Sequence, residues 1–305
     1  MDLITSKRGD LEVTVEGRQL KLTNLGKIFW PELKITKGEL LNFYLKIAPY
    51  ILPYLKDRPE SLLRYPNGIR GQAFYQKNID GLAPGWAEIL PVSSEENKKT
   101  INYFLCQNLA SLLYLINLGC IDLNPWNSRK NSLNRPDYLI IDLDPEAIDF
   151  QAVIETALAV KSVLDELGLI GYPKTSGATG IHIYLPLQAK YDYKTVREFA
   201  RLLVTVIHQK FPKITSIERS PSKRQGRVYL DYLQNARGQT LAAPYSLRAR
   251  QNAAVSTPLS WLELQNSQFL PDNFNYYNIF DRLDKVGDIF APVLTKVNPL
   301  PTNFL

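Results

Sequence analysis

Hydrophobic positions recur along the chain with two spacings, and each spacing predicts a different kind of element. Apolar residues three and four apart follow Thr36–Glu39, a Thr-x-x-Glu pattern typical of a helix start. Short alternating or continuously apolar stretches between turn residues predict strands. The predicted helices are residues 37–51, 107–118, 150–167 and 194–210, and the predicted strands are 11–15, 19–23, 62–65, 73–77, 138–143, 170–174, 181–187, 227–233 and 240–243.

The order of these elements favours an α+β fold. Helices and strands alternate without a strict strand–helix–strand rhythm, and the last third of the chain is poor in helix. Residues 227–233 and 240–243 are predicted to pair as a hairpin. Because no Ser/Gly-rich linker interrupts the chain, we expect residues 1–305 to form a single domain.

Composition excludes several classes of protein. The only cysteines are Cys106 and Cys120 and the only histidines are His182 and His208, too few for a structural zinc cluster or a disulfide framework. No G-x-S-x-G motif accompanies either histidine. No apolar run approaches the ~18 residues of a membrane span, and the N-terminus lacks a signal core. We therefore expect a cytoplasmic protein whose metal, if any, is held by carboxylates.

The first candidate for chemistry is Asp142-Leu-Asp144-Pro145 at the end of an apolar strand. Alternate residues of a strand share a face, so both carboxylates project together. They repel each other unless a cation neutralises them, and hard divalent cations such as Mg²⁺ or Mn²⁺ prefer oxygen ligands. Taken alone, the pair has a simpler interpretation as solvated carboxylates at a strand end.

Two further motifs suggest a site for a phosphorylated ligand. Ser176-Gly-Ala-Thr179-Gly leads into a strand with His182, and such a turn can bring backbone amides close to a phosphate. Arg248 and Arg250 alternate onto one face, which suits a triphosphate. Each has a plain structural alternative, a tight hairpin for the turn and surface ion pairs for the arginines.

Asp231 lies within an apolar strand, where an unpaired charge is costly. Basic residues also interleave with aromatic ones around Phe74-Tyr75 and around Phe29-Trp30, a pattern that can follow a phosphate backbone and stack bases. The alternative is that the rings belong to the core and the charges to its rim. The formal charge of +6 mildly favours a polyanionic partner.

Seven motifs in one order resemble the primase-polymerase domain of bacterial non-homologous end-joining ligase D, in the archaeo-eukaryotic primase superfamily. The resemblance covers nearly the whole chain. It implies mixed β-sheets flanked by helices, with an RRM-like catalytic core. The motifs lie at residues 22–31, 64–68, 73–77, 142–145, 175–182, 231–235 and 243–248.

The resemblance implies a template-directed polymerase that adds nucleotides, preferably ribonucleotides, at DNA breaks by two-metal nucleotidyl transfer. Asp142, Asp144 and Asp231 match the carboxylates that hold two Mn²⁺ or Mg²⁺ ions. The nucleotide-binding positions are Ser176, Thr179, His182, Arg248, Arg250, Phe74, Tyr75 and Gln234, and the DNA-binding positions are Lys27, Lys37, Arg64, Lys77 and Arg224.

The implied partners are nucleoside triphosphates, DNA ends with a 5′-phosphate, the Ku protein and a separate DNA ligase, with the protein in the cytoplasm at the nucleoid. Lys27 and Lys37 match lysines that hold the 5′-phosphate, and we expect amides at the helix start after Thr36 to join that pocket. Ser176 matches the position beside the ribose.

Three positions depart from the family pattern. Asn124 replaces a common histidine, Thr179 a frequent lysine and Leu63 a residue that is basic in some members. They bear on nucleotide affinity and primer handling and leave open a catalytically silent DNA-end-binding module. A primase that starts chains de novo would share the three carboxylates and is a second alternative. A dehalogenase-type phosphatase also begins with Asp-x-Asp, but Glu146 stands where that family has Thr or Val.

Overall fold

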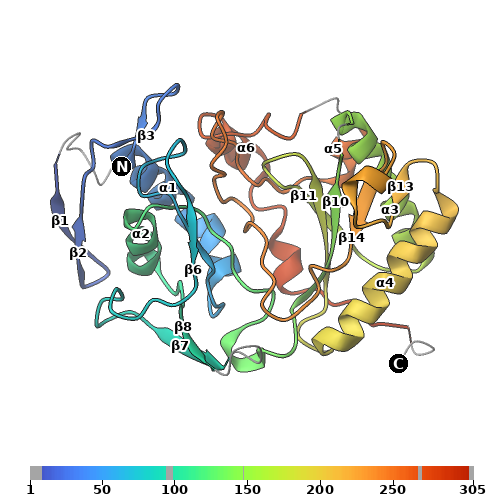
Figure 1. Cartoon of the computed structure of the whole chain (residues 1–305), viewed down its shortest axis with the longest axis horizontal. Coiled ribbons are helices and arrows are strands. Elements are labelled where there is room, and N and C mark those ends of the chain that lie inside the picture. The colour runs from blue at the N-terminus through green and yellow to red at the C-terminus, as the bar shows by residue number, and fades with distance from the viewer. Residues whose placement is uncertain (1–8, 94–98, 147, 267–269, 302–305) are drawn as a thin grey trace.

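The computed structural model describes residues 9–93, 99–146, 148–266 and 270–301, and a mixed sheet lies at its centre (Figure 1). This central sheet consists of β10 (Tyr138–Asp144), β11 (Tyr172–Thr175), β12 (Ile181–Pro186), β13 (Thr215–Ser216) and β14 (Val228–Asp231). The strand order is β11-β12-β10-β14-β13. Neighbouring strands are antiparallel except β13 and β14, which are parallel.

Helices cover the sheet on one side and build a separate core with short strands on the other. The α-helices of the described residues are α1 (Lys37–Leu55), α2 (Leu109–Asn117), α3 (Phe150–Glu166), α4 (Tyr193–Lys210), α5 (Trp261–Asn266) and α6 (Ile279–Val286). The remaining strands are β1 (Leu11–Val15), β2 (Arg18–Leu22), β3 (Ile28–Trp30), β4 (Ile35–Thr36), β5 (Leu62–Arg64), β6 (Phe74–Gln76), β7 (Ile89–Ser93), β8 (Thr100–Phe104) and β9 (Cys120–Asp122).

Alternation along β10 gives the central sheet two different faces. Leu139, Ile141 and Leu143 are fully buried in one core, which contains the apolar sides of α3 and α4. Tyr138 and Ile140 belong instead to the core built around α1. Because side chains alternate along a strand, the residues that follow on this second face of β10 point away from α3 and α4.

The order of elements around the sheet is that of an RRM-like fold. β10, α3, β11, β12, α4 and β14 follow one another as β-α-β-β-α-β, with both helices contacting the sheet. The antiparallel order β11-β12-β10-β14 completes the arrangement, and β13 extends it by one parallel strand. The predicted α+β fold with an RRM-like core is therefore confirmed.

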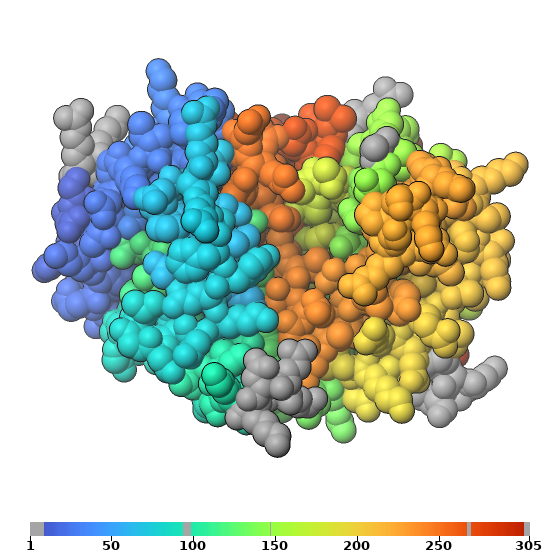
Figure 2. All heavy atoms as spheres, viewed as in Figure 1, coloured from blue at the N-terminus to red at the C-terminus, as the bar shows by residue number. Residues whose placement is uncertain are grey.

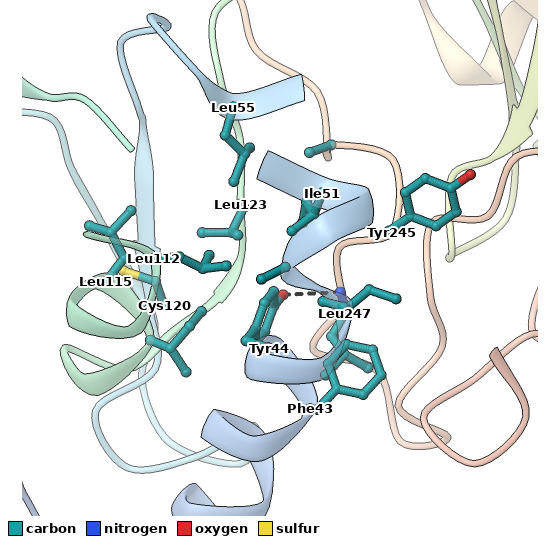
Figure 3. Close-up of a cluster of buried hydrophobic side chains, with 14 of the residues drawn as sticks. Phe43, Tyr44, Ile51, Leu55, Leu112, Leu115, Cys120, Leu123, Tyr245 and Leu247 are labelled. Atoms are coloured by element: carbon teal, nitrogen blue, oxygen red, sulfur yellow. Dashed lines mark hydrogen bonds between the residues drawn. The ribbon is translucent and has the colours of Figure 1, made fainter. Parts of the chain in front are cut away.

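Helix α1 is the centre of the second core, which Figure 3 shows in close-up. Thr36 caps this helix and Glu39 reaches back to the Thr36 backbone, so the predicted capping box is present. The buried Tyr44 hydroxyl donates to the Ile121 carbonyl at 2.6 Å and accepts from the Leu247 amide at 3.1 Å. These bonds join α1 to β9 and to the C-terminal part of the chain.

One predicted pairing is wrong. Residues 227–233 and 240–243 do not form a hairpin, because β14 pairs with β10 and β13, whereas Thr240 forms an isolated bridge with Trp126. The reason lies in Asn235, whose side chain accepts from the Ile140 amide at 2.8 Å and donates to its carbonyl at 2.7 Å. This clamp directs the chain along β10 after Asp231 instead of back along β14.

The other predicted strands and helices of the described residues are present, with ends shifted by a few positions. Among the described residues of the C-terminal third, the α-helices are the end of α4 and the short α5 and α6, as expected. Within the described residues, no helix is both long and apolar enough to cross a membrane.

Gly180 lies close against the backbone of β10. A Cβ at this position would lie 2.2 Å from the Leu143 carbonyl oxygen, whereas a Cβ at the exposed Gly85 would meet nothing within 4 Å. We expect Gly180→Ala to lower the free energy of unfolding by about 1–3 kcal/mol, the usual cost of overpacking. Gly85→Ala is the matched control, and urea unfolding of both variants measures the difference. Equal stabilities would show that the turn relaxes freely.

Candidate active site

A row of ionisable side chains crosses four strands of the central sheet. Asp142 on β10 lies opposite Asp231 on β14 and opposite His182 on β12. His182 in turn lies opposite Lys174 on β11. This register places Lys174, His182, Asp142 and Asp231 on the sheet face away from α3 and α4, and Asp144 shares that face two residues after Asp142.

The Lys174 end of the row is deeply buried. Lys174 is 0% and His182 3% exposed. Lys174 Nζ lies 3.0 Å from His182 Nδ1 and donates to Ser256 Oγ at 2.6 Å. His182 Nε2 lies 3.4 Å from Asp142 Oδ1. Burial, followed by nearby positive charges, lowers the pKa of both Lys174 and His182.

The carboxylates repel one another. Burial, followed by the charges of Asp231 and Asp144, raises the pKa of Asp142 to about 7, against the opposing charges of Lys174 and Arg248. A pair of acids with uncompensated charge favours a bound cation. The donor set, carboxylate oxygens only, fits a hard divalent cation such as Mg²⁺ or Mn²⁺.

Asp144 and Asp231 also have protein partners. Arg224 Nη1 donates to Asp144 Oδ2 at 3.1 Å, and its guanidinium stacks on the Tyr229 ring. Asp231 accepts from the Leu233 amide at 2.7 Å and from Gln234 Nε2 at 3.2 Å. In the part of the chain that the structure describes, no three acidic, histidine or cysteine side chains are grouped so that they could hold a metal ion. For all three aspartates to coordinate a cation, Asp144 must therefore break its ion pair with Arg224 or contact Arg224 and the cation at the same time.

The glycine-rich turn is stabilised from within. Ser176 Oγ accepts from the Ala178 amide at 3.1 Å and from the Gly180 amide at 3.0 Å. These bonds use the acceptor capacity of the hydroxyl and leave its proton available for a ligand. Arg248 Nη1 donates to the Ser176 carbonyl, which links the turn to the C-terminal part of the chain.

Arg248 is fixed by a residue that sequence reasoning missed. Its Nε donates to Asp122 Oδ2 at 3.0 Å, and the Asp122 side chain is only 5% exposed. Asn124, one of the departures from the family pattern, is buried and donates to the Asp122 carbonyl at 3.0 Å. Leu63, another departure, lies opposite Asp122 on β5. The apolar surroundings of Asp122 in the sequence were the signal that a buried partner was needed.

A cleft of about 590 Å³ lies beside this turn. Gly177, Ala178 and Thr179 line it together with Arg250 and, from the N-terminal part, Ile69. Figure 2 shows recessed yellow-green atoms between the orange C-terminal segment and green atoms, with the cyan N-terminal segment beyond the orange one. The structure thus brings the predicted nucleotide residues Thr179 and Arg250 to one cleft. Arg248 does not line this cleft and instead contacts the turn through the Ser176 carbonyl.

The aromatic pair lies on β6, away from the apolar core. Phe74 is 43% and Tyr75 65% exposed, far more than rings that belong to a core. Arg64 on the neighbouring strand stacks on Phe74 and donates to Gln76 Oε1 at 2.7 Å. Lys77 is exposed and follows directly. These residues form a basic and aromatic surface available to a ligand.

Lys27 and Lys37 lie together at the start of α1. The Lys37 amide donates to the Lys27 carbonyl at 2.8 Å. The Lys37 side chain is buried and donates to the Thr23 carbonyl at 2.6 Å, whereas Lys27 is exposed and donates to Asn67 Oδ1 at 2.7 Å. Burial, and then the charge of Lys27, lowers the pKa of Lys37 to about 8. Two ammonium groups held this close favour an anionic ligand.

The expected contribution of the helix-start amides is wrong. The amides of the first turn of α1 are already bonded within the protein, those of Lys37 and Gly38 to carbonyls of residues 27 and 25 and that of Glu39 to Thr36 Oγ1. Any phosphate bound here is therefore held by side chains alone.

An RRM-like sheet with opposed carboxylates on the face away from α3 and α4 agrees with the resemblance to the primase-polymerase class of nucleotidyltransferases. The family model "LigD, primase-polymerase domain" matches residues 36–290. The chain therefore belongs to the LigD primase-polymerase domain family.

Relatives and a solved structure agree with this assignment. The bifunctional non-homologous end joining protein LigD of Bacillus subtilis is 34% identical over 272 residues, 88% of this chain and 43% of that protein. The multifunctional LigD of Mycolicibacterium smegmatis is 30% identical over 278 residues, 90% of this chain and 36% of that protein. The chain thus spans less than half the length of these relatives.

The structure is also similar to the polymerase domain of Mycobacterium tuberculosis ligase D, solved in complex with DNA. The TM-score is 0.83 at 26% identity, and the match covers 92% of this chain and 99% of the solved one. The resemblance seen in the sequence is confirmed. The individual site residues and the role of Arg224 toward DNA stay predictions.

The carboxylate row makes a prediction about metal binding. At pH 8, Mn²⁺ should raise the melting temperature of the wild-type protein, because a bound ligand stabilises the folded state by about 2.7 kcal/mol at a concentration 100 times its Kd. Asp142→Asn should be more stable than wild type without metal, because one repelling charge is gone, and should lose most of the Mn²⁺ effect. The exposed Asp284→Asn is the control. An undiminished Mn²⁺ shift in Asp142→Asn would exclude this carboxylate as a ligand.

Proposed function

We propose that this chain is a template-directed polymerase that adds nucleotides at the ends of broken DNA during non-homologous end joining. The observation that carries the proposal is the opposition of Asp142 and Asp231 across β10 and β14, with Asp144 on the same face. The family assignment and the similarity to a polymerase domain solved with DNA support it.

Asp142, Asp144 and Asp231 would hold two divalent cations, Mn²⁺ or Mg²⁺. When bound, such ions lower the pKa of a primer 3′-hydroxyl and neutralise the triphosphate during in-line displacement. The protein's own part is to fix the carboxylates in register. His182 lies against Asp142 and limits the movement of that side chain, and Gln234 does the same for Asp231.

The incoming nucleotide would lie between the glycine-rich turn and the exposed ring pair. Thr179, Arg250 and Arg248 supply hydroxyl and guanidinium groups for its phosphates, and Phe74 and Tyr75 offer faces for a base. The free hydroxyl proton of Ser176 suits a ribose 2′-oxygen, and the small Gly177 and Ala178 beside it would admit the extra oxygen. We therefore propose a preference for ribonucleotides.

The DNA end would be held on the N-terminal side. Lys27 and Lys37 suit a terminal 5′-phosphate, and Arg64, Lys77 and Arg224 suit the strand beside it. We propose that residues 1–305 act as one catalytic domain in the cytoplasm, at the nucleoid, together with Ku and a separate DNA ligase.

The proposed chemistry is tested by removing the carboxylates one at a time. Asp142→Ala, Asp144→Ala and Asp231→Ala should each lower nucleotide addition to a primed template with Mn²⁺ by at least about 100-fold, the scale of losing a central electrostatic group. DNA affinity should change less than about twofold, because it comes from Lys and Arg.

Asp284→Ala, which removes an exposed carboxylate on α6, is the control and should keep full activity. Near-wild-type extension by any of the three variants would contradict the assignment of that residue. A wild-type protein that binds DNA ends without extending them would instead be the silent end-binding module. Wild-type extension that ignores a downstream 5′-phosphate would favour a general primase.

The proposed 5′-phosphate pocket predicts a pH dependence. Lys37, with a pKa of about 8, is mostly charged at pH 7 and mostly neutral at pH 9. A terminal phosphate is a dianion over this range, because its second pKa is about 6. The affinity advantage of 5′-phosphate over 5′-hydroxyl DNA should therefore fall as pH rises from 7 toward 10. Because a bound phosphate raises the pKa of Lys37, the fall should occur in the upper part of that range.

Lys37→Arg retains its charge throughout this range and should keep the advantage at high pH. Fluorescence anisotropy on paired 5′-phosphate and 5′-hydroxyl substrates measures both effects. If the advantage in wild type does not depend on pH, or if Lys37→Arg does not flatten the dependence, Lys37 does not contact the terminal phosphate.

A further inference from the structure

A second basic region lies outside the site described above. A groove of about 460 Å³ runs between α4 and the segment that follows β14. Its cationic residues are Lys194, Arg197 and Arg201 on α4 and Arg237 on the facing segment, and Glu198 is its acidic residue. Both walls lie on the side of the molecule that faces the viewer in Figure 1.

The cations on α4 are arranged in a line. Lys194, Arg197 and Arg201 are spaced three and four residues apart, so they share one side of the helix. All three are exposed, and within the described chain none of them forms an ion pair. Glu198 lies one helical turn after Lys194 in the same groove, and the Asp192 carboxylate caps α4 by accepting from the Thr195 amide at 2.8 Å. These exposed like charges repel one another modestly, and a bound anion would relieve that repulsion.

The opposite wall is rigid. Arg237 stacks over the Trp126 ring, 5.5 Å from its centroid, and its Nε donates to Asn134 Oδ1 at 3.0 Å. Asn235 is clamped to both backbone groups of Ile140. The groove therefore has one wall fixed to β10 and a second wall of helical side chains, which is a preformed site and not a mobile loop.

The groove lies near the carboxylates along the chain. Tyr232, Asn235 and Arg237 line it and follow Asp231 within six residues of the chain. Ile140, which holds Asn235, lies two residues before Asp142. The Lys27 and Lys37 pair at the start of α1 lies far from it, because β3 and α1 are on the left of Figure 1 and α4 is on the right. The catalytic sheet thus separates two basic regions.

We propose that this groove binds the phosphate backbone of the upstream DNA duplex, the part that carries the primer strand into the site. The inference rests on the proposed polymerase function and adds the place of the second DNA arm. Lys194 and Arg201 are about 10 Å apart along the helix axis at 1.5 Å per residue. This span matches about three steps of a DNA strand at 3.4 Å each, which favours a continuous backbone over a single small anion.

The test measures DNA affinity as a function of upstream length. Fluorescence anisotropy is recorded in EDTA with primer-templates whose upstream duplex is about 5 or about 15 base pairs, roughly 17 and 51 Å long. The wild-type protein should bind the longer duplex more tightly. Arg197→Ala/Arg201→Ala should lose about tenfold in affinity for the longer duplex and little for the shorter one. Its salt dependence should weaken by about 1.8 in log–log slope, because two phosphate contacts are gone.

The matched control is Lys213→Ala/Lys285→Ala, which removes two exposed cations outside the groove. It should bind both duplexes as wild type does. All four substituted side chains are exposed, so the variants should fold, and far-UV circular dichroism confirms this. Equal loss in both double variants, or no dependence on upstream length in wild type, would overturn the groove as a DNA site.

The same substrates separate this inference from the proposed function. Wild-type protein is also assayed for nucleotide addition with Mn²⁺. If the wild-type protein extends primers normally and the groove variants bind DNA as the wild type does, only the proposal about the groove is overturned. Length-dependent binding that is lost in the groove variants, without any extension by wild type, supports the groove and contradicts the polymerase.

Discussion

The antiparallel register of β10 with β14 is the constraint on which the site depends. It sets Asp142 directly opposite Asp231, and the two backbone positions stay opposed while the strands stay paired. Burial and the charges of Asp231 and Asp144 raise the pKa of Asp142 to about 7, so its charged form is disfavoured unless a cation is bound. The preference of this site for cations therefore follows from the pairing of two strands and not from the conformation of a flexible loop.

The two faces of the central sheet have different roles, one in stability and one in the proposed chemistry. Leu139, Ile141 and Leu143 bury the sheet against α3 and α4, and this core holds the strands in register. The opposite face carries the charged row and, beside it, Tyr138 and Ile140, which contact the core around α1. Because one-residue slippage would exchange the faces, the apolar core and the carboxylates specify the same register. Stability and chemistry are thereby coupled in each strand.

Much of this was predictable from the sequence, because local patterns define elements and ordered motifs define the family. The capping box at Thr36 and the Asp-x-Asp strand end were recognised from a few residues each. Partners distant in the chain were not. The Asp122–Arg248 pair joins residues 126 positions apart, and the clamp of Asn235 on Ile140 spans 95. The hairpin prediction failed for this reason, since strand propensity does not reveal which strand is the partner.

The central claim is that the opposed carboxylates on β10 and β14 hold the catalytic cations. Anomalous diffraction from crystals grown with Mn²⁺ and a nucleoside triphosphate tests it most directly. The account predicts an anomalous peak between the Asp142 and Asp231 carboxylates, with Asp144 turned toward it and away from Arg224. Mn²⁺ bound elsewhere, with Asp142 and Asp231 uncoordinated beside a bound nucleotide, would contradict the account.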